Sequence, residues 1–281
     1  MRRLLLLIAL VPAAALPAAP AAPAAIVHPR KATDVVVRVS SGGGFVPVQV
    51  NLRALPSFTL YGDGTVVAPG AVIQISPGPA IYPLVRSRLS EPQVQALLRR
   101  AQAAGLLARG AIAYGDMGAV GVSDMPTTTV IINARGRHIQ RSAYALGATR
   151  AAGRLSPAQV EARRALSRFI ARLPHGLAGT PFVPRAIAVY AGPFHASAQP
   201  GSRDVRWPLA TNLATAGTRP ASAGGFRCIT VRGLAAKTLL ATLRAANEAS
   251  PWIAAARAKQ RYEVIARPLL PDERDCAALG A

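Results

Sequence analysis

Apolar and polar residues alternate with a period of two in several short stretches of the chain. Residues 34–40 place three valines on one face, which predicts a strand. Two β-hairpins are expected, at residues 58–67 around Asp63-Gly64 and at 127–144 around Ala134-Arg135-Gly136. The four prolines within residues 69–83 predict an irregular connection.

Two helices begin with the same capping pattern. Ser90 and Ser156 each precede a proline and stand three residues before a glutamine, as in a capping box. Apolar residues then recur at helical spacing, and Gly105 predicts the end of the first helix. Both helices begin with the frame Leu-Ser-x-x-Gln-Val-x-Ala. An internal duplication could explain this shared frame, but we prefer the explanation that both helices use the same capping chemistry. The first half therefore predicts an α+β fold, with two helices on one face of a two-layer antiparallel sheet.

A second, smaller α+β unit is expected after a Pro- and Gly-rich linker at 174–184. Strands are predicted at 186–190, 228–232 and 261–267, with a helix following the second of them. We therefore expect an N-terminal α+β domain at residues 34–174 and a C-terminal unit at residues 185–281. In an exported protein, Cys228 and Cys276 predict one disulfide that clamps this β-α-β unit.

The N-terminus has the features of a secretory signal peptide, assigned to residues 1–24. Arg2 and Arg3 precede a short apolar run and then a tract of alanine and proline. Cleavage after Ala15, Ala18, Ala21 or Ala24 fits this pattern equally well. The apolar run is shorter than the ~20 residues that cross a bilayer, so no transmembrane segment is expected in the mature chain. General export is favoured over a twin-arginine route, and a secreted or envelope-associated protein is expected.

The chain is strongly basic, with a formal net charge of +21. Such a charge favours anionic partners, for example an acidic envelope polymer. However, thirty arginines against three lysines, together with abundant Ala, Gly and Pro, are also typical of a GC-rich genome. The basic residues form no long run, and no specific nucleic-acid partner is predicted.

Candidate catalytic residues are few. Asp116 and Asp124 flank a Gly-containing loop before the second hairpin, and His138 lies on its return strand. Two carboxylates and a histidine are suited to acid–base chemistry or to metal binding. However, their spacing matches no metal-ligand pattern, and Asp124-Met-Pro is also typical of a turn. No cofactor or metal is predicted.

Other signatures of chemistry are missing or weak. The sequence contains no Gly-x-Ser-x-Gly, no His-Glu-x-x-His and no phosphate-binding loop. Trp207, between Arg206 and Pro208 in a loop, is the better candidate of the two tryptophans for an exposed stacking ring. Trp252 is expected to pack against the preceding helix.

Several segments resemble a group of uncharacterised secreted proteins of high-GC bacteria. These are residues 60–66, 126–130, 142–147 and 267–273, and the resemblance extends from about residue 35 to 276. It implies export and an α+β fold, and it transfers no site residue.

The function hypothesis is a non-enzymatic envelope or extracellular protein that binds an anionic polymer or another protein through basic surface. The alternative is a secreted hydrolase that uses Asp116, Asp124 and His138. A third possibility is an inhibitor or partner-binding module, which would present a large exposed apolar patch.

Overall fold

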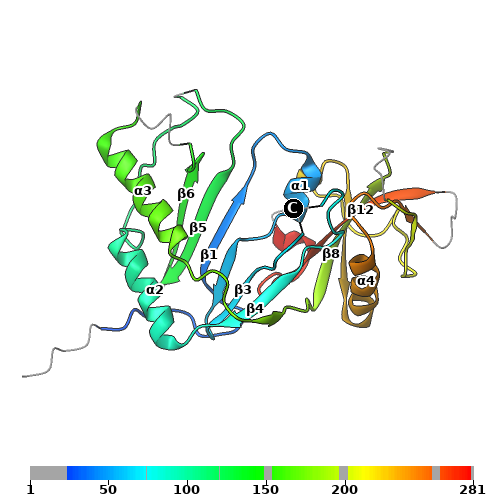
Figure 1. Cartoon of the computed structure of the whole chain (residues 1–281), viewed down its shortest axis with the longest axis horizontal. Coiled ribbons are helices and arrows are strands. Elements are labelled where there is room, and N and C mark those ends of the chain that lie inside the picture. Colours follow the sequence, from blue (N-terminus) through cyan, green and yellow to red (C-terminus); the bar gives the residue numbers. More distant parts are fainter. Residues whose placement is uncertain are drawn as a thin grey trace, which may run out of the picture.

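The computed structural model describes residues 24–73, 75–119, 121–148, 154–195, 202–254 and 260–279. The predicted signal peptide lies outside these residues except for Ala24. Two sheets lie side by side, each with helices against it (Figure 1).

The elements in chain order are β1 Val35–Gly42, α1 Val48–Arg53, β2 Phe58–Tyr61, β3 Thr65–Pro69, β4 Leu84–Arg88, α2 Glu91–Ala103, β5 Thr127–Ala134, β6 Arg137–Tyr144, α3 Pro157–Ala171, β7 Thr180–Pro181, β8 Ala186–Pro193, β9 Val205–Arg206, the 3₁₀ helix η2 Ala221–Ala223, β10 Arg227–Arg232, α4 Gly233–Ala245, β11 Trp252–Ile253, β12 Arg261–Pro268 and the 3₁₀ helix η3 Cys276–Leu279.

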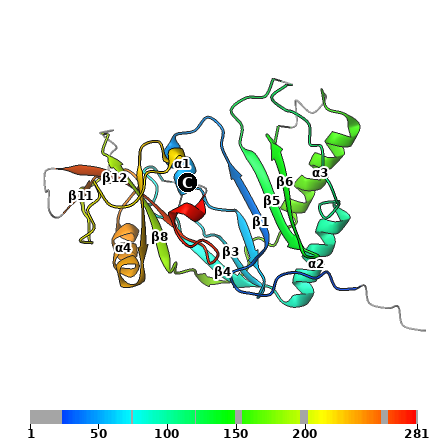
Figure 2. The same ribbon diagram turned by 180° about the vertical axis from the view of Figure 1, so that it is seen from behind.

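The first sheet has seven strands in the order β6-β5-β1-β2-β3-β4-β7, and all of its pairs are antiparallel. Helices α2 and α3 cover one face of it (Figure 2). Apolar side chains of both helices and of β1, β2, β5 and β6 form one core. The α+β prediction, with two helices on an antiparallel sheet, is confirmed.

The local signals set these boundaries as expected. Gln93 accepts the Ser90 N–H at 2.7 Å, and Gln159 accepts the Ser156 N–H at 2.9 Å, as in capping boxes. Gly105 follows α2 with a φ of +74°, which suits a residue without a β-carbon. In the first hairpin Gly64 has a φ of +86°, and a Cβ there would lie 2.4 Å from the Leu89 carbonyl oxygen.

The alternation predicted for the first strand is wrong in one detail. A β-bulge lies between Val35 and Val37, so the register shifts there. As a result Val36 and Val37 are both fully buried, on a strand that was expected to bury only every second residue.

The second sheet has the order β10-β8-β12-β11-β9, in which only the β11–β9 pair is parallel. Strand β8 lies between β10 and β12 and is buried on both faces. Ile187, Val189 and Ala191 face a core shared with α4. Ala188 and Tyr190 face a second core that includes α1 and η3. Besides the three predicted strands, this sheet contains the short strands β9 and β11, which were not predicted.

The predicted disulfide is present. Cys228 at the start of β10 is bonded to Cys276 in η3, and both side chains are buried. It therefore joins β10, which precedes α4, to the segment after β12, as expected from the sequence.

Polar contacts join the two sheets. Asp272, in the loop after β12, accepts hydrogen bonds from Arg38 at 2.6 Å and from the Tyr61 hydroxyl at 2.7 Å. Burial, together with Asp272, raises the pKa of Tyr61. Arg53 of α1 also pairs with Glu248. The division into two domains stays a prediction, but residues from both sides of the linker meet along this boundary.

Candidate functional site

The structure places the two candidate aspartates in one loop and satisfies one of them locally. The Asp116 carboxylate accepts the N–H groups of Gly118 at 2.9 Å and Ala119 at 3.2 Å. Asp124 is exposed and has a φ of +59°, a turn conformation that aspartate tolerates. These contacts indicate that the Asp116 carboxylate shapes the loop.

His138 lies far from this loop. It pairs with Asn133 near the turn of the β5–β6 hairpin, and its Nδ1 lies 2.8 Å from the Asn133 side-chain oxygen. Asp124 lies beyond the other end of the hairpin, where Thr127 pairs with Tyr144. Six residues of strand separate these ends by about 20 Å, at about 3.4 Å per residue. The structure therefore does not bring His138 to the aspartates.

The expectation that Trp207 is exposed is wrong. Its side chain is 2% exposed and packs edge-on against Trp252, with the ring centroids 5.8 Å apart. Both rings belong to the core between α4 and the second sheet. The polar residues around Trp207 did not indicate this burial in the sequence. In the structure, the short strand β9 brings the ring inward.

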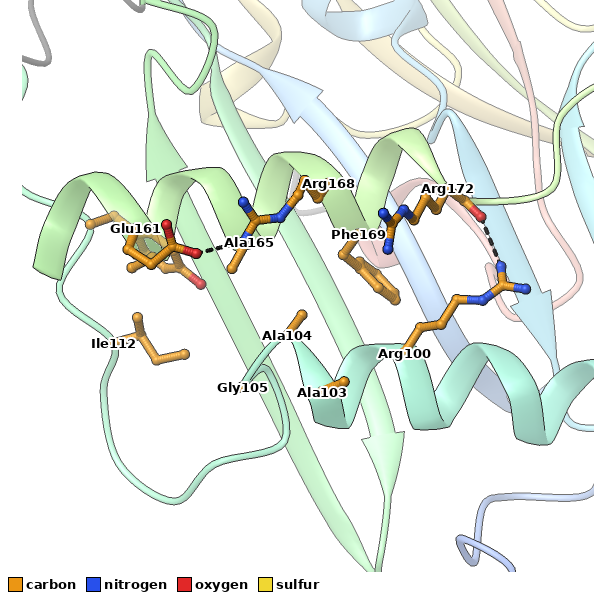
Figure 3. Close-up of a pocket in the computed structure, with 12 residues that line it drawn as sticks. Arg100, Ala103, Ala104, Gly105, Ile112, Glu161, Ala165, Arg168, Phe169 and Arg172 are labelled. Carbon is orange, nitrogen blue, oxygen red and sulfur yellow. Dashed lines mark hydrogen bonds and ion pairs between the residues drawn. The ribbon is translucent and has the colours of Figure 1, made fainter.

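A groove between α2 and α3 is the best candidate site, and we call it the helix groove. It has a volume of about 510 Å³. Its walls combine alanine and apolar side chains with three exposed arginines, which Figure 3 shows along the two helices. The charged and aromatic side chains that line it are Arg100, Tyr114, Glu161, Arg168, Phe169 and Arg172.

The three arginines differ in their partners. Arg100 donates to the main-chain carbonyl of Arg172 at 3.1 Å, so it also stabilises the C-terminal end of α3. Arg168 pairs with Glu161, and both side chains are more than half exposed. Such surface pairs are weak, so an incoming anion can compete with Glu161. The Arg172 guanidinium has no hydrogen-bond or carboxylate partner within the described part of the chain.

Tyr114 supplies a buried polar group to the helix groove. Its side chain is 6% exposed, and its hydroxyl has no hydrogen-bond partner among the described residues. Burial raises the pKa of this phenol, against a lowering by Arg141, so it remains protonated at neutral pH. A buried hydroxyl without a partner is costly in the free protein and can donate to a bound acceptor.

Two buried arginines hold the segment that forms the outer wall of the helix groove. Arg141 of β6 donates to the carbonyls of Leu106 at 3.0 Å, Ala108 at 2.6 Å and Gly110 at 2.6 Å.

Arg163 of α3 acts in the same way further along that segment. It donates to the carbonyls of Tyr114 at 3.2 Å and Tyr144 at 3.0 Å, and also to Ala145. Burial lowers the pKa of Arg163, but a guanidinium remains charged in proteins. Residues 106–114 are thus tied to the hairpin and to α3 by hydrogen bonds from cations.

Sequence reasoning missed the helix groove. Arg168 lies in the last turn of α3 and Arg172 at its C-cap, four residues later, so they lie on the same side of a helix that was predicted. That spacing signals a basic face, but it does not reveal that α2 lies beside it.

Within the described residues, no group of three or more His, Cys, Asp or Glu side chains could hold a metal ion. In the same part of the chain, no helix is long and apolar enough to cross a membrane. Comparison with protein-family models, curated proteins and solved structures finds no match for this chain. The function therefore has to be argued from the site itself.

Proposed function

We propose that the protein is an exported, non-enzymatic protein that binds an anionic envelope polymer at the helix groove. The observation on which this rests is the Arg172 guanidinium, which has no partner in the described structure and lies with Arg100 and Arg168 beside one concave surface. Arginine guanidinium groups pair well with carboxylates and phosphates because their donors form a planar fork.

The shape of the helix groove supports a chain-like ligand. The arginines lie along two neighbouring helices rather than around a closed cavity, so successive negative charges can contact them in turn (Figure 3). Phe169 supplies apolar wall beside the arginines, and Ile112 supplies it at the end of the groove near Glu161 (Figure 3). The Tyr114 hydroxyl adds a neutral donor near the same wall.

The sequence supports export and an acidic partner independently of the groove. The N-terminal signal pattern and the resemblance to secreted proteins both favour export. The formal net charge of +21 adds long-range attraction toward a negatively charged polymer. A hydrolase built on Asp116, Asp124 and His138 is not favoured, because His138 lies at the far end of the hairpin.

Co-sedimentation of the purified protein with isolated bacterial envelopes across a salt series tests this proposal. Poly-L-glutamate and polyphosphate serve as defined probes in a parallel titration. Binding should weaken as salt rises, because exposed charges are screened over about 10 Å at 0.1 M ionic strength. Arg168→Gln with Arg172→Gln should weaken it by about tenfold or more, since hydrogen bonds to charged groups contribute about 1.5–3 kcal/mol each.

A matched control removes the same charge elsewhere. Arg203 and Arg219 are exposed and do not line the helix groove. Arg203→Gln with Arg219→Gln should change binding by less than about twofold, since screening limits the effect of distant charges. Equal losses for both double variants would mean that overall charge, and not the helix groove, determines binding.

A further inference from the structure

A second arginine-lined hollow lies where the two sheets meet, and we call it the junction cleft. It has a volume of about 500 Å³. One side is formed by β4 and by the segment after β7, and the other by the end of β10 and the loop after β12. The disulfide fixes the second side, because Cys276 follows this loop and is bonded to β10.

Four exposed arginines border the junction cleft, and they come from both sheets: Arg86, Arg185, Arg232 and Arg274. Arg232 donates to the main-chain carbonyl of Arg274 at 2.6 Å and lies 3.9 Å from the Asp275 carboxylate. The guanidinium groups of the other three have no carboxylate partner within the described residues. Like charges on separate elements are thus held around one cavity.

The two carboxylates of the junction cleft do not neutralise these arginines. Asp63 accepts the N–H and the hydroxyl of Thr65, both at 2.9 Å, within the hairpin turn. Glu273 accepts both arms of Arg267, at 2.7 and 2.9 Å, and the Leu270 N–H at 2.8 Å. Glu273 is thus paired with Arg267, and the single charge of Asp63 is outnumbered by the four arginines, so the cleft keeps a net positive charge.

Apolar side chains complete the lining. Phe182 lines the first side of the cleft, and Leu269, Leu270 and Pro271 line the second. The Phe182 N–H bonds to the Leu84 carbonyl at 2.8 Å, which holds the segment after β7 against β4. A volume near 500 Å³ with an apolar wall and a few charged groups is typical of a site for a small molecule.

We propose that the junction cleft binds a small amphiphilic anion, namely a carboxylate or phosphate group attached to an apolar body. The anionic group pairs with the fork of Arg185, Arg274 or Arg86, since arginine binds both carboxylate and phosphate bidentately. The apolar body lies against Phe182 and Leu270. This site is separate from the helix groove and goes beyond the function proposed for that groove.

A ligand in the junction cleft contacts both sheets, so it should also stabilise the protein. Anything that binds only the folded state raises its free energy of unfolding with ligand concentration. A thermal shift measured alongside the affinity therefore reports on occupancy by a second route.

Calorimetric titration with four probes tests the proposal: octyl phosphate, octanoate, inorganic phosphate and octanol, each below its aggregation concentration. Octyl phosphate or octanoate should bind at least tenfold more tightly than inorganic phosphate, and octanol should not bind measurably. Tighter octyl phosphate identifies a phosphate ligand, and tighter octanoate a carboxylate. Equal binding of octyl phosphate and inorganic phosphate would overturn the amphiphilic site.

The variant Arg185→Gln with Arg274→Gln should weaken the preferred probe by about tenfold or more, because each change removes a charged hydrogen-bond donor. Both side chains are exposed, so unliganded stability should be retained, and the thermal shift at a given probe concentration should become smaller. Arg168→Gln with Arg172→Gln should leave probe affinity within twofold. If instead the second pair weakens the probe and the first does not, the probe lies in the helix groove, and the junction-cleft proposal fails while the function proposed for the groove stands.

Discussion

The two sheets are stabilised by different chemistry. In the half that carries the helix groove, buried Arg141 and Arg163 donate to main-chain carbonyls of the groove wall, which also packs Leu106 and Tyr114 into the first core. In the other half, buried Arg267 pairs with the Glu273 carboxylate, and a disulfide ties β10 to the segment after β12. The wall of the helix groove thus depends on apolar packing and on hydrogen bonds from arginines distant in sequence, whereas the C-terminal wall of the junction cleft is fixed covalently. Substitutions confined to one half of the molecule should therefore affect one of the two sites and not the other.

Removal of the disulfide should have the largest effect. It closes a loop spanning 48 residues, so its loss should lower the free energy of unfolding by about 4 kcal/mol under the chain-entropy account. Trp207 and Trp252 are both buried in the C-terminal core, so tryptophan fluorescence reports on that half during urea unfolding. Cys228→Ala with Cys276→Ala should shift this transition to lower urea.

Reduction of the wild-type protein serves as the control, because it breaks the bond without changing the sequence. Under conditions where the reduced protein stays folded, polymer binding at the helix groove should persist. An unchanged urea midpoint after verified reduction would show that the second sheet does not depend on the disulfide.

Loss of one buried arginine should be the next largest effect, and it should act on the helix groove. Arg163→Met removes the guanidinium donor from the carbonyls of Tyr114, Tyr144 and Ala145, of which Ala145 still accepts the Ala148 N–H at 2.9 Å. Leaving buried acceptors unsatisfied should lower the free energy of unfolding by about 3 kcal/mol. Polymer binding should weaken as well, because the segment that bears Tyr114 is no longer held to α3.

The neighbouring residue provides a matched control. Arg164 lies on the same helix and is exposed, so Arg164→Met should change stability by less than about 0.5 kcal/mol. Equal destabilisation by the two substitutions, measured by urea unfolding, would show that the carbonyl contacts of Arg163 contribute little.

Substitution of Tyr114 and of Tyr144 by phenylalanine should have different effects on the free energy of unfolding. Tyr114 has a buried hydroxyl without a described partner, so Tyr114→Phe should leave stability unchanged or raise it by up to about 1 kcal/mol. In contrast, the Tyr144 hydroxyl accepts the Met125 N–H at 3.2 Å and donates to the Val122 carbonyl at 3.3 Å. Tyr144→Phe should therefore lower stability by about 1 kcal/mol.

Binding should reverse the order of the two tyrosine variants. Tyr114→Phe should weaken polymer binding about fivefold through the loss of one hydrogen bond, about 1 kcal/mol, while Tyr144→Phe should leave it nearly unchanged. Affinity that is insensitive to Tyr114→Phe would remove this hydroxyl from the proposed binding surface.

Elements with strong local signals could be predicted from the sequence. Local structure is determined by a few neighbouring residues at the capping boxes of Ser90 and Ser156 and at the turns of Gly64 and Gly136. The disulfide could be predicted by elimination, because the sequence has only two cysteines. Helix α1 gave no such signal, because it has six residues and buries only Leu52. A stretch that short cannot show a helical period.

The sites depended on tertiary packing, which a linear pattern does not contain. Arg168 and Arg172 were visible as a basic face, but the helix groove exists only because α2 lies beside α3. The arginines of the junction cleft come from four segments spread over almost 190 positions, from Arg86 to Arg274. Trp207 was misjudged for the same reason, since its burial depends on α4 and Trp252.

The smallest expected effect concerns how the N-terminal segment is attached to the first sheet. Glu91, at the start of α2, lies 3.2 Å from His28 Nε2, 2.6 Å from Arg30 and 2.8 Å from Gln95. Partial burial would raise the pKa of this carboxyl, but the hydrogen bonds from Gln95, His28 and Arg30 outweigh it and hold the pKa below its ordinary value near 4.5. The ionised form is therefore stabilised by folding.

This lowered pKa fixes the sign of the pH dependence. The contribution of Glu91 to stability is fully present above its unfolded-state pKa near 4.5 and is lost as pH falls through the lower folded-state value. Glu91→Gln should thus be slightly less stable than the wild type at pH 7, and the difference should shrink below pH 4.5. Urea unfolding at both pH values measures it, and a gap that stays constant or widens in acid would exclude this role for the carboxylate. Glu161→Gln is the control: among the described residues its carboxylate pairs only with Arg168, on an exposed face, so the urea midpoint should hardly move at either pH.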